Sequence, residues 1–148
     1  MAEVPLLRAV LDTNVYVSGT IIKRGTPFEG LQAWRRGAYQ LVISEAIIAE
    51  IIRALNYPKL RDRFAITSDE LQALALSLRT DALVSPGHYE VTAVSADPTD
   101  DKFLACALEA QADCVVTGDK HLLSLGQYQR IAILRPAEFL ARLEQPAG

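Results

Sequence analysis

Short apolar runs and longer amphipathic segments alternate along the chain. Each apolar run stops at polar or turn residues, as buried strands do, and the runs lie at 6–11, 39–43, 114–117 and 131–134, with a further candidate at 89–94. Between these runs, apolar residues recur at helical spacing behind Ser, Thr, Asp or Pro start signals. The pattern predicts helices at 15–22, 26–37, 44–55 capped by Ser44, 59–64, 68–78 capped by Ser68, 100–110, around 122–123, and from Pro136 onward.

Strands that alternate with helices predict an α/β fold with a parallel sheet, because each crossover must lay a helix back on the sheet. No repeat, linker or low-complexity tract interrupts this order, and 148 residues is a common length for one domain. We therefore expect residues 1–148 to form a single domain. In open parallel sheets, ligands bind beyond the carboxyl ends of the strands, so the functional site is expected at that edge.

Composition narrows the class of protein further. Half of the residues are hydrophobic and 22% are charged, which argues against a disordered chain, and the formal net charge of −3 argues against a broadly basic surface. Cys106 and Cys114 are too few for a disulfide framework and lack the spacing of zinc ligands, so both are expected to be buried. The sequence shows no signal peptide or membrane span, and we expect a cytoplasmic protein without membrane association.

Three aspartates are placed where chemistry is expected. Asp12 and Asp119 each follow a predicted strand, so both should emerge at one edge of a parallel sheet, although either could simply cap the next helix. Asp101 lies within the apolar stripe of its helix, formed by Leu104, Ala105, Leu108 and Ala112, where an unpaired carboxylate is costly. The neighbouring Asp100 lies nearer the stripe's margin and is ranked as auxiliary.

Glu50 is the fourth acidic candidate. It lies more than one turn inside the helix at 44–55, where the helix dipole does not explain a carboxylate, although a solvent-facing position is also compatible with the pattern. If the four acids converge, carboxylates about 4 Å apart would repel by around 4 kcal/mol per pair at an effective dielectric near 20. A divalent cation would relieve this repulsion, and an all-oxygen site without His or Cys suits Mg²⁺ or Mn²⁺.

Four segments carry a family resemblance by their order and spacing: LDTN at 11–14, the 44–50 segment with its Glu, DPTDDKFLA at 97–105 and VTGDKHLL at 116–123. The resemblance is to the PIN-domain family of nucleases, most closely to the single-domain bacterial toxins of type II toxin–antitoxin pairs. It implies a three-layer α/β/α sandwich and Mg²⁺- or Mn²⁺-dependent hydrolysis of RNA by metal-activated water. In this resemblance Asp12, Glu50, Asp101 and Asp119 match the acidic metal ligands, and Asn14 and Thr117 match auxiliary polar positions.

The same resemblance implies partners: an RNA substrate, a cognate antitoxin protein and a second copy of the chain in a homodimer. A basic strip with interleaved aromatic residues offers a candidate contact for RNA phosphates, although it could equally be a solvated helical face. Its basic residues are Arg53, Lys59, Arg61 and Arg63.

The sequence also bears on other classes of protein. A solitary PIN-type nuclease of RNA processing would lack an adjacent antitoxin reading frame, and a non-catalytic RNA- or protein-binding PIN module would not need all four acids. A phosphoacceptor signalling domain is disfavoured because it requires an acidic pair at the end of the first strand, where Asp12 is followed by Thr13 and Asn14. The Gly-rich Lys motif of P-loop proteins is absent from the sequence.

Overall fold

The computed structural model describes residues 6–91 and 98–145, and within them six strands form one sheet. The strand order is β3-β2-β1-β4-β6-β5, and every neighbouring pair is parallel except β5 and β6. The mostly parallel α/β architecture therefore matches the expected fold. The strands are β1 (Arg8–Leu11), β2 (Gln40–Ser44), β3 (Leu83–Ser85), β4 (Cys114–Val116), β5 (Gln127–Tyr128) and β6 (Ile131–Leu134).

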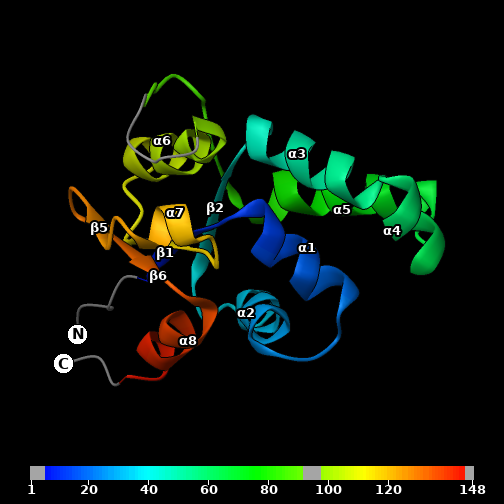
Figure 1. Cartoon of the computed structure of the whole chain (residues 1–148), viewed down its shortest axis with the longest axis horizontal. Coiled ribbons are helices and arrows are strands. Elements are labelled where there is room, and N and C mark those ends of the chain that lie inside the picture. The colour runs from blue at the N-terminus through cyan, green and yellow to red at the C-terminus, as the bar shows by residue number, and fades with distance from the viewer. Residues whose placement is uncertain (1–5, 92–97, 146–148) are drawn as a thin grey trace.

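Helices cover both faces of this sheet (Figure 1). Figure 1 shows α6 on one side of the sheet and α2 and α8 on the other, while α3 and α5 run side by side away from it. The helices are α1 (Thr13–Ile21), α2 (Thr26–Arg35), α3 (Glu45–Leu55), α4 (Pro58–Arg63), α5 (Ser68–Asp81), α6 (Asp101–Glu109), α7 (Lys120–Leu123) and α8 (Pro136–Glu144), with a 3₁₀ turn η1 (Pro98–Asp100) before α6.

The core lies between the sheet and its helices. Strands β1 and β4 are almost entirely buried, as the continuous apolar runs predict for strands covered on both faces. Tyr39 meets Phe139 of α8 edge to face at a centroid distance of 4.8 Å, and its hydroxyl donates to the carbonyl of Gly30 at 2.8 Å. Cys106 and Cys114 are free and buried as expected, and burial raises the pKa of their thiols to about 11 and about 12.

One glycine is required by the packing of α1 against α2. A Cβ atom on Gly19 would lie 2.6 Å from the carbonyl oxygen of Pro27 and 2.9 Å from the side chain of Leu31. These distances are below van der Waals contact, so only glycine lets the two helices approach this closely. This close approach fixes the position of α1, the helix that follows Asp12.

The structure corrects the sequence-based elements in several places. The third strand is β3, which the pattern missed because its three residues follow α5 with only Ala82 between them, so no turn signal sets it apart from the helix. Of the strand predicted at 89–94, residues 89–91 are irregular and 92–94 lie outside the described residues. The cap of α5 is Thr67, not Ser68, because Thr67 and Glu70 form a reciprocal capping box.

The sheet is also not purely parallel, because β5 pairs with β6 in the antiparallel sense. Only residues 129 and 130 separate the two strands, and Gln129 has a φ of 53°. A parallel connection needs a crossover of a dozen or more residues, so a link this short permits only a hairpin.

The described helices include none that is long and apolar enough to cross a membrane.

Candidate active site

Adjacent strand ends bring Asp12 and Thr117 together. Strands β1 and β4 pair in register, and the backbone N–H of Asp12 donates to the carbonyl of Val116 at 3.0 Å. Asp12 is 4% exposed and caps α1 by accepting from the backbone N–H of Val15 at 2.8 Å. Its other carboxylate oxygen accepts a hydrogen bond from the hydroxyl of the fully buried Thr117. Both the capping role and the strand-edge position expected of Asp12 are therefore present.

Thr117 also links Asp12 to Asp119. The Thr117 hydroxyl oxygen accepts from the backbone N–H of Asp119 at 2.9 Å, and Asp119 caps α7 by accepting from the N–H of His121 at 2.7 Å. Burial raises the pKa of Asp12 above its usual 3.8, and the nearby charge of Asp119 acts in the same direction, against the lowering effect of the Thr117 hydrogen bond. We call Asp12, Thr117 and Asp119 the Asp12 corner.

Glu50 lies on α3 and is held by two side chains. The hydroxyl of Thr13 donates to its Oε1, and the ammonium of Lys102 lies 2.6 Å from its Oε2. The Glu50 side chain is 31% exposed and that of Lys102 23%, so this ion pair is partly shielded from solvent. Because Thr13 directly follows Asp12 in the chain, Glu50 is brought near the Asp12 corner. We call Thr13, Glu50 and Lys102 the Glu50 corner.

Asp100 and Asp101 are both buried at the start of α6, so burial does not rank one above the other. Asp101 faces inward as its helical position predicts. The predicted apolar stripe is partly correct, because Leu104 and Ala112 are buried but Ala105 and Leu108 are only partly buried. The buried face also includes Phe103, Cys106 and Ala107, which the prediction missed. Asp97, the turn residue before Pro98, lies outside the described residues.

The remaining predicted positions are more exposed. Asn14 is exposed on α1 and, with Asp119, lines an open hollow of about 300 Å³ beside Pro136. Within the basic strip, Arg53, Lys59 and Arg63 are exposed.

Arg61 differs from the other basic residues of the strip because its guanidinium is engaged within the chain. It donates to Asn56 Oδ1 at 2.6 Å, to Ser68 Oγ at 2.6 Å and to the carbonyl of Ile66 at 3.1 Å. These bonds join the end of α3 to the start of α5. Arg61 is therefore a structural residue in this state, with fewer donors left for RNA than its neighbours have.

The donor chemistry of this edge suits a hard divalent cation, because its candidate ligands are all carboxylate oxygens. Within residues 6–91 and 98–145, however, no group of three or more His, Cys, Asp or Glu side chains has an arrangement that could hold a metal ion. Both carboxylate oxygens of Asp12 accept hydrogen bonds from the protein itself, and those of Glu50 accept one hydrogen bond and form one ion pair. Convergence of all four acids around one cation thus remains a prediction.

Two residues of the site were not singled out by the sequence analysis. Thr13 and Lys102 both contact Glu50, yet each lies within a motif that was noted for its acids. Lys102 directly follows Asp101, and a lysine immediately after a candidate ligand is the signal that could have found it. Thr13 gave no such signal, since a threonine in the first turn of a helix is common.

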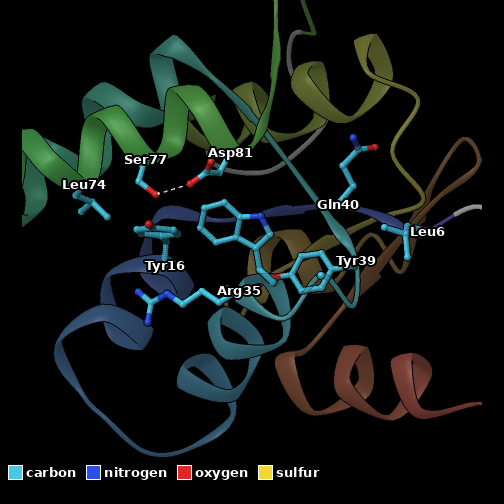
Figure 2. Close-up of a pocket in the computed structure, with 10 residues that line it drawn as sticks. Leu6, Tyr16, Arg35, Tyr39, Gln40, Leu74, Ser77 and Asp81 are labelled. Carbon is cyan, nitrogen blue, oxygen red and sulfur yellow. Dashed lines mark hydrogen bonds between the residues drawn. The ribbon is translucent and has the colours of Figure 1, made fainter.

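A larger hollow, of about 420 Å³, lies at the opposite edge of the sheet (Figure 2). Leu6 before β1 and Gln40 at the start of β2 line it, so it lies at the amino ends of those strands, away from Asp12. Figure 2 shows Tyr16, Arg35 and Tyr39 around it, with Ser77 donating to Asp81 at 3.2 Å. Its single acidic residue, Asp81, does not resemble a metal centre, so the carboxyl edge is the better candidate active site.

The chain is similar to a known protein, to a solved structure and to a family of domains. Uncharacterized protein MJ1680 of Methanocaldococcus jannaschii is 29% identical to this chain, over 94% of this chain and 93% of its own. The crystal structure of FitAcB from Neisseria gonorrhoeae covers 87% of this chain and 98% of its own, with 17% identity and a TM-score of 0.46. A family model described as PIN domain matches residues 8–121, a span that contains Asp12, Glu50, Asp101 and Asp119. The chain therefore belongs to the PIN-domain family, whose members are typically metal-dependent nucleases.

Proposed function

We propose that this protein is a ribonuclease that hydrolyses RNA phosphodiester bonds with Mg²⁺ or Mn²⁺ held by Asp12, Glu50, Asp101 and Asp119. The observation that carries the proposal is the linkage of Asp12 to Asp119 through Thr117, with Glu50 joined to the adjacent residue Thr13. Two acids that follow β1 and β4 and one acid of α3 are thereby linked at one edge of the sheet. An edge rich in carboxylates is suited to RNA cleavage only when a cation offsets its charge.

The protein's own groups have distinct roles in this proposal. Thr117 and the N–H of Val15 fix both oxygens of Asp12, and Thr13 fixes one oxygen of Glu50. A bound divalent cation supplies an activated water and neutralises phosphate charge. Asn14, Asp100 and Thr117 are auxiliary groups that hold carboxylates or water. Exposed Arg53, Lys59 and Arg63 are assigned to RNA phosphates, and Arg61 is placed with them only secondarily because its donors are engaged.

The test is cleavage of end-labelled single-stranded and structured RNA by purified protein with Mg²⁺, Mn²⁺ or excess EDTA. Asp12→Asn and Asp101→Asn should each abolish cleavage while circular dichroism remains that of the wild type. Asp69→Asn, a matched change at an exposed position of α5 outside the basic strip, should leave cleavage unchanged. Cleavage by wild type and by both site variants in excess EDTA would contradict the proposal.

A toxin role with an antitoxin partner is the second part of the proposal, and it rests on the likeness of the motifs to single-domain bacterial toxins. The antitoxin is expected to lay a segment over the acidic edge and to place a basic side chain among its carboxylates. A homodimer is proposed on the same ground. Induced expression should stop growth, Asp12→Asn should not, and co-expression of an adjacent short reading frame should restore growth. Wild-type expression without growth arrest would favour a solitary RNA-processing nuclease.

A further inference from the structure

Lys102 places a positive charge inside the proposed acidic site. Its ammonium lies 2.6 Å from Glu50 Oε2 and also donates to the backbone carbonyl of Thr99. The same ammonium lies 5.0 Å from the centroid of the Phe103 ring, within the range of a cation–π contact. Three different contacts thus hold one lysine head group at the start of α6.

The contacts of Glu50 leave little room for a second cation on the same oxygen. Thr13 donates to Oε1 and Lys102 occupies Oε2, so both oxygens already have a partner from the chain. An ammonium and a divalent ion bound to Oε2 together would lie within a few ångströms of each other and repel strongly. The hydroxyl of Thr13 is neutral and does not oppose a metal in this way. Binding of a cation through Glu50 Oε2 therefore requires Lys102 to move.

We propose that Lys102 is the resident counter-ion of the site and that a divalent cation displaces it from Glu50. This inference rests on the proposed function, because it takes Glu50 as a metal ligand. Lys102 would keep Glu50 in place and offset its charge whenever no metal is bound. Lys102 is thus a positioning residue whose contact with Glu50 competes with the metal.

The test measures Mn²⁺ binding by isothermal titration calorimetry, with Lys102→Met as the decisive variant because methionine keeps much of the side-chain length without the charge. Loss of the competing ion pair should tighten Mn²⁺ binding by about fivefold, which corresponds to about 1 kcal/mol. Lys102→Arg should restore weaker binding. In excess EDTA, Lys102→Met should melt at a lower temperature than wild type, and saturating Mn²⁺ should narrow that gap.

Two controls separate direct competition from a general change of charge. Lys120→Met removes the same charge from an exposed residue next to Asp119, and its effect on Mn²⁺ affinity should be clearly smaller. In a Glu50→Gln background, Lys102→Met should no longer change the affinity, because the two residues act through one contact.

The outcomes distinguish this inference from the proposed function. If wild type binds Mn²⁺ but Lys102→Met leaves the affinity unchanged or weakens it, the counter-ion role is wrong and the nuclease proposal stands. An equal tightening by Lys120→Met would likewise overturn the counter-ion role. If neither wild type nor Lys102→Met binds Mn²⁺ under conditions where RNA is cleaved, the metal-dependent function itself fails.

Discussion

The Asp12 corner and the Glu50 corner hold their carboxylates by opposite means. Asp12 is almost fully buried and receives hydrogen bonds only from neutral groups, the Val15 N–H and the Thr117 hydroxyl, among the contacts described for it. Glu50 is about one third exposed and is paired with an ammonium. Neutral donors fix a carboxylate without cancelling its charge, whereas an ammonium cancels it directly.

This difference assigns distinct tasks to the two corners. In the proposed function, the Asp12 carboxylate gains most from an added cation, because the contacts described for it are neutral and burial raises its pKa. In the same proposal, Glu50 is already paired with Lys102 and must exchange this partner for the metal. A carboxylate held this way can join or leave a metal site with little rearrangement of the backbone.

The largest expected effect is on RNA cleavage. Asp12→Asn should lower kcat/KM by at least about a hundredfold, because in the proposed function it removes the charge of a metal ligand. Glu50→Gln should lower it by less, since metal binding through Glu50 requires displacement of Lys102, which reduces the net contribution of this carboxylate. Single-turnover cleavage with saturating Mn²⁺ gives both values. A larger loss from Glu50→Gln than from Asp12→Asn would reverse the proposed ranking of the corners.

Removal of one hydroxyl at each corner should affect stability unequally. Thr117→Val leaves the buried Asp12 oxygen without its donor and the Asp119 N–H without its acceptor, which should cost about 1–3 kcal/mol of unfolding free energy. Thr13→Val should cost less than about 1 kcal/mol, because Glu50 keeps Lys102 and contact with solvent. Urea denaturation in EDTA measures both. Equal losses would show that the two corners are not differently buried in solution.

The raised pKa of Asp12 predicts an unusual dependence of stability on pH. Burial makes the folded protein hold this proton more tightly than the unfolded chain, so the stability that Asp12 contributes is full at low pH and is lost as pH rises through the raised pKa. In metal-free buffer at pH 7, Asp12→Asn should therefore unfold at higher urea concentration than wild type. This advantage should shrink as the pH falls toward 3.8, the usual value for Asp. A variant less stable than wild type at pH 7 would contradict it.

The smallest expected effect comes from a glutamate in the same helix as Glu50. Glu45 pairs with Arg79 at 3.0 Å on the exposed surface, and this hydrogen bond lowers the pKa of Glu45. Solvent screens such a pair, so Glu45→Gln should leave both Mn²⁺ affinity and RNA cleavage unchanged. It is thus the matched control for Glu50→Gln. A loss of Mn²⁺ affinity in Glu45→Gln would show that the metal responds to charge anywhere on α3.

The fold was largely predictable from the sequence because its central strands are continuous apolar runs that end at polar residues. The runs at 39–43 and 131–134 give β2 and β6 almost to the residue. Elements set by tertiary context were not predictable in this way. Strand β3 has three residues and is stabilised by pairing with β2, and β5 has two residues and exists through its hairpin with β6.

The sequence predicted which strand ends carry the acidic residues of the candidate site, but not which side chains contact those residues. The positions of Asp12 and Asp119 follow from the pairing and parallel direction of β1 and β4, which the alternation of elements implies. The ion pair between Glu50 and Lys102 joins residues 52 positions apart on different helices. Helical periodicity gives the face of each residue but not which two helices meet, so this contact required the structure.

The most direct test of the account is a crystal structure of the wild-type protein from a crystal soaked in Mn²⁺. An anomalous difference map is calculated from data collected at the manganese edge. We expect a peak within coordination distance of Asp12 and Glu50, with the Lys102 ammonium more than 4 Å from Glu50 Oε2. A protein that cleaves RNA yet shows its manganese peak away from both carboxylates would contradict the assignment of the carboxyl edge as the active site.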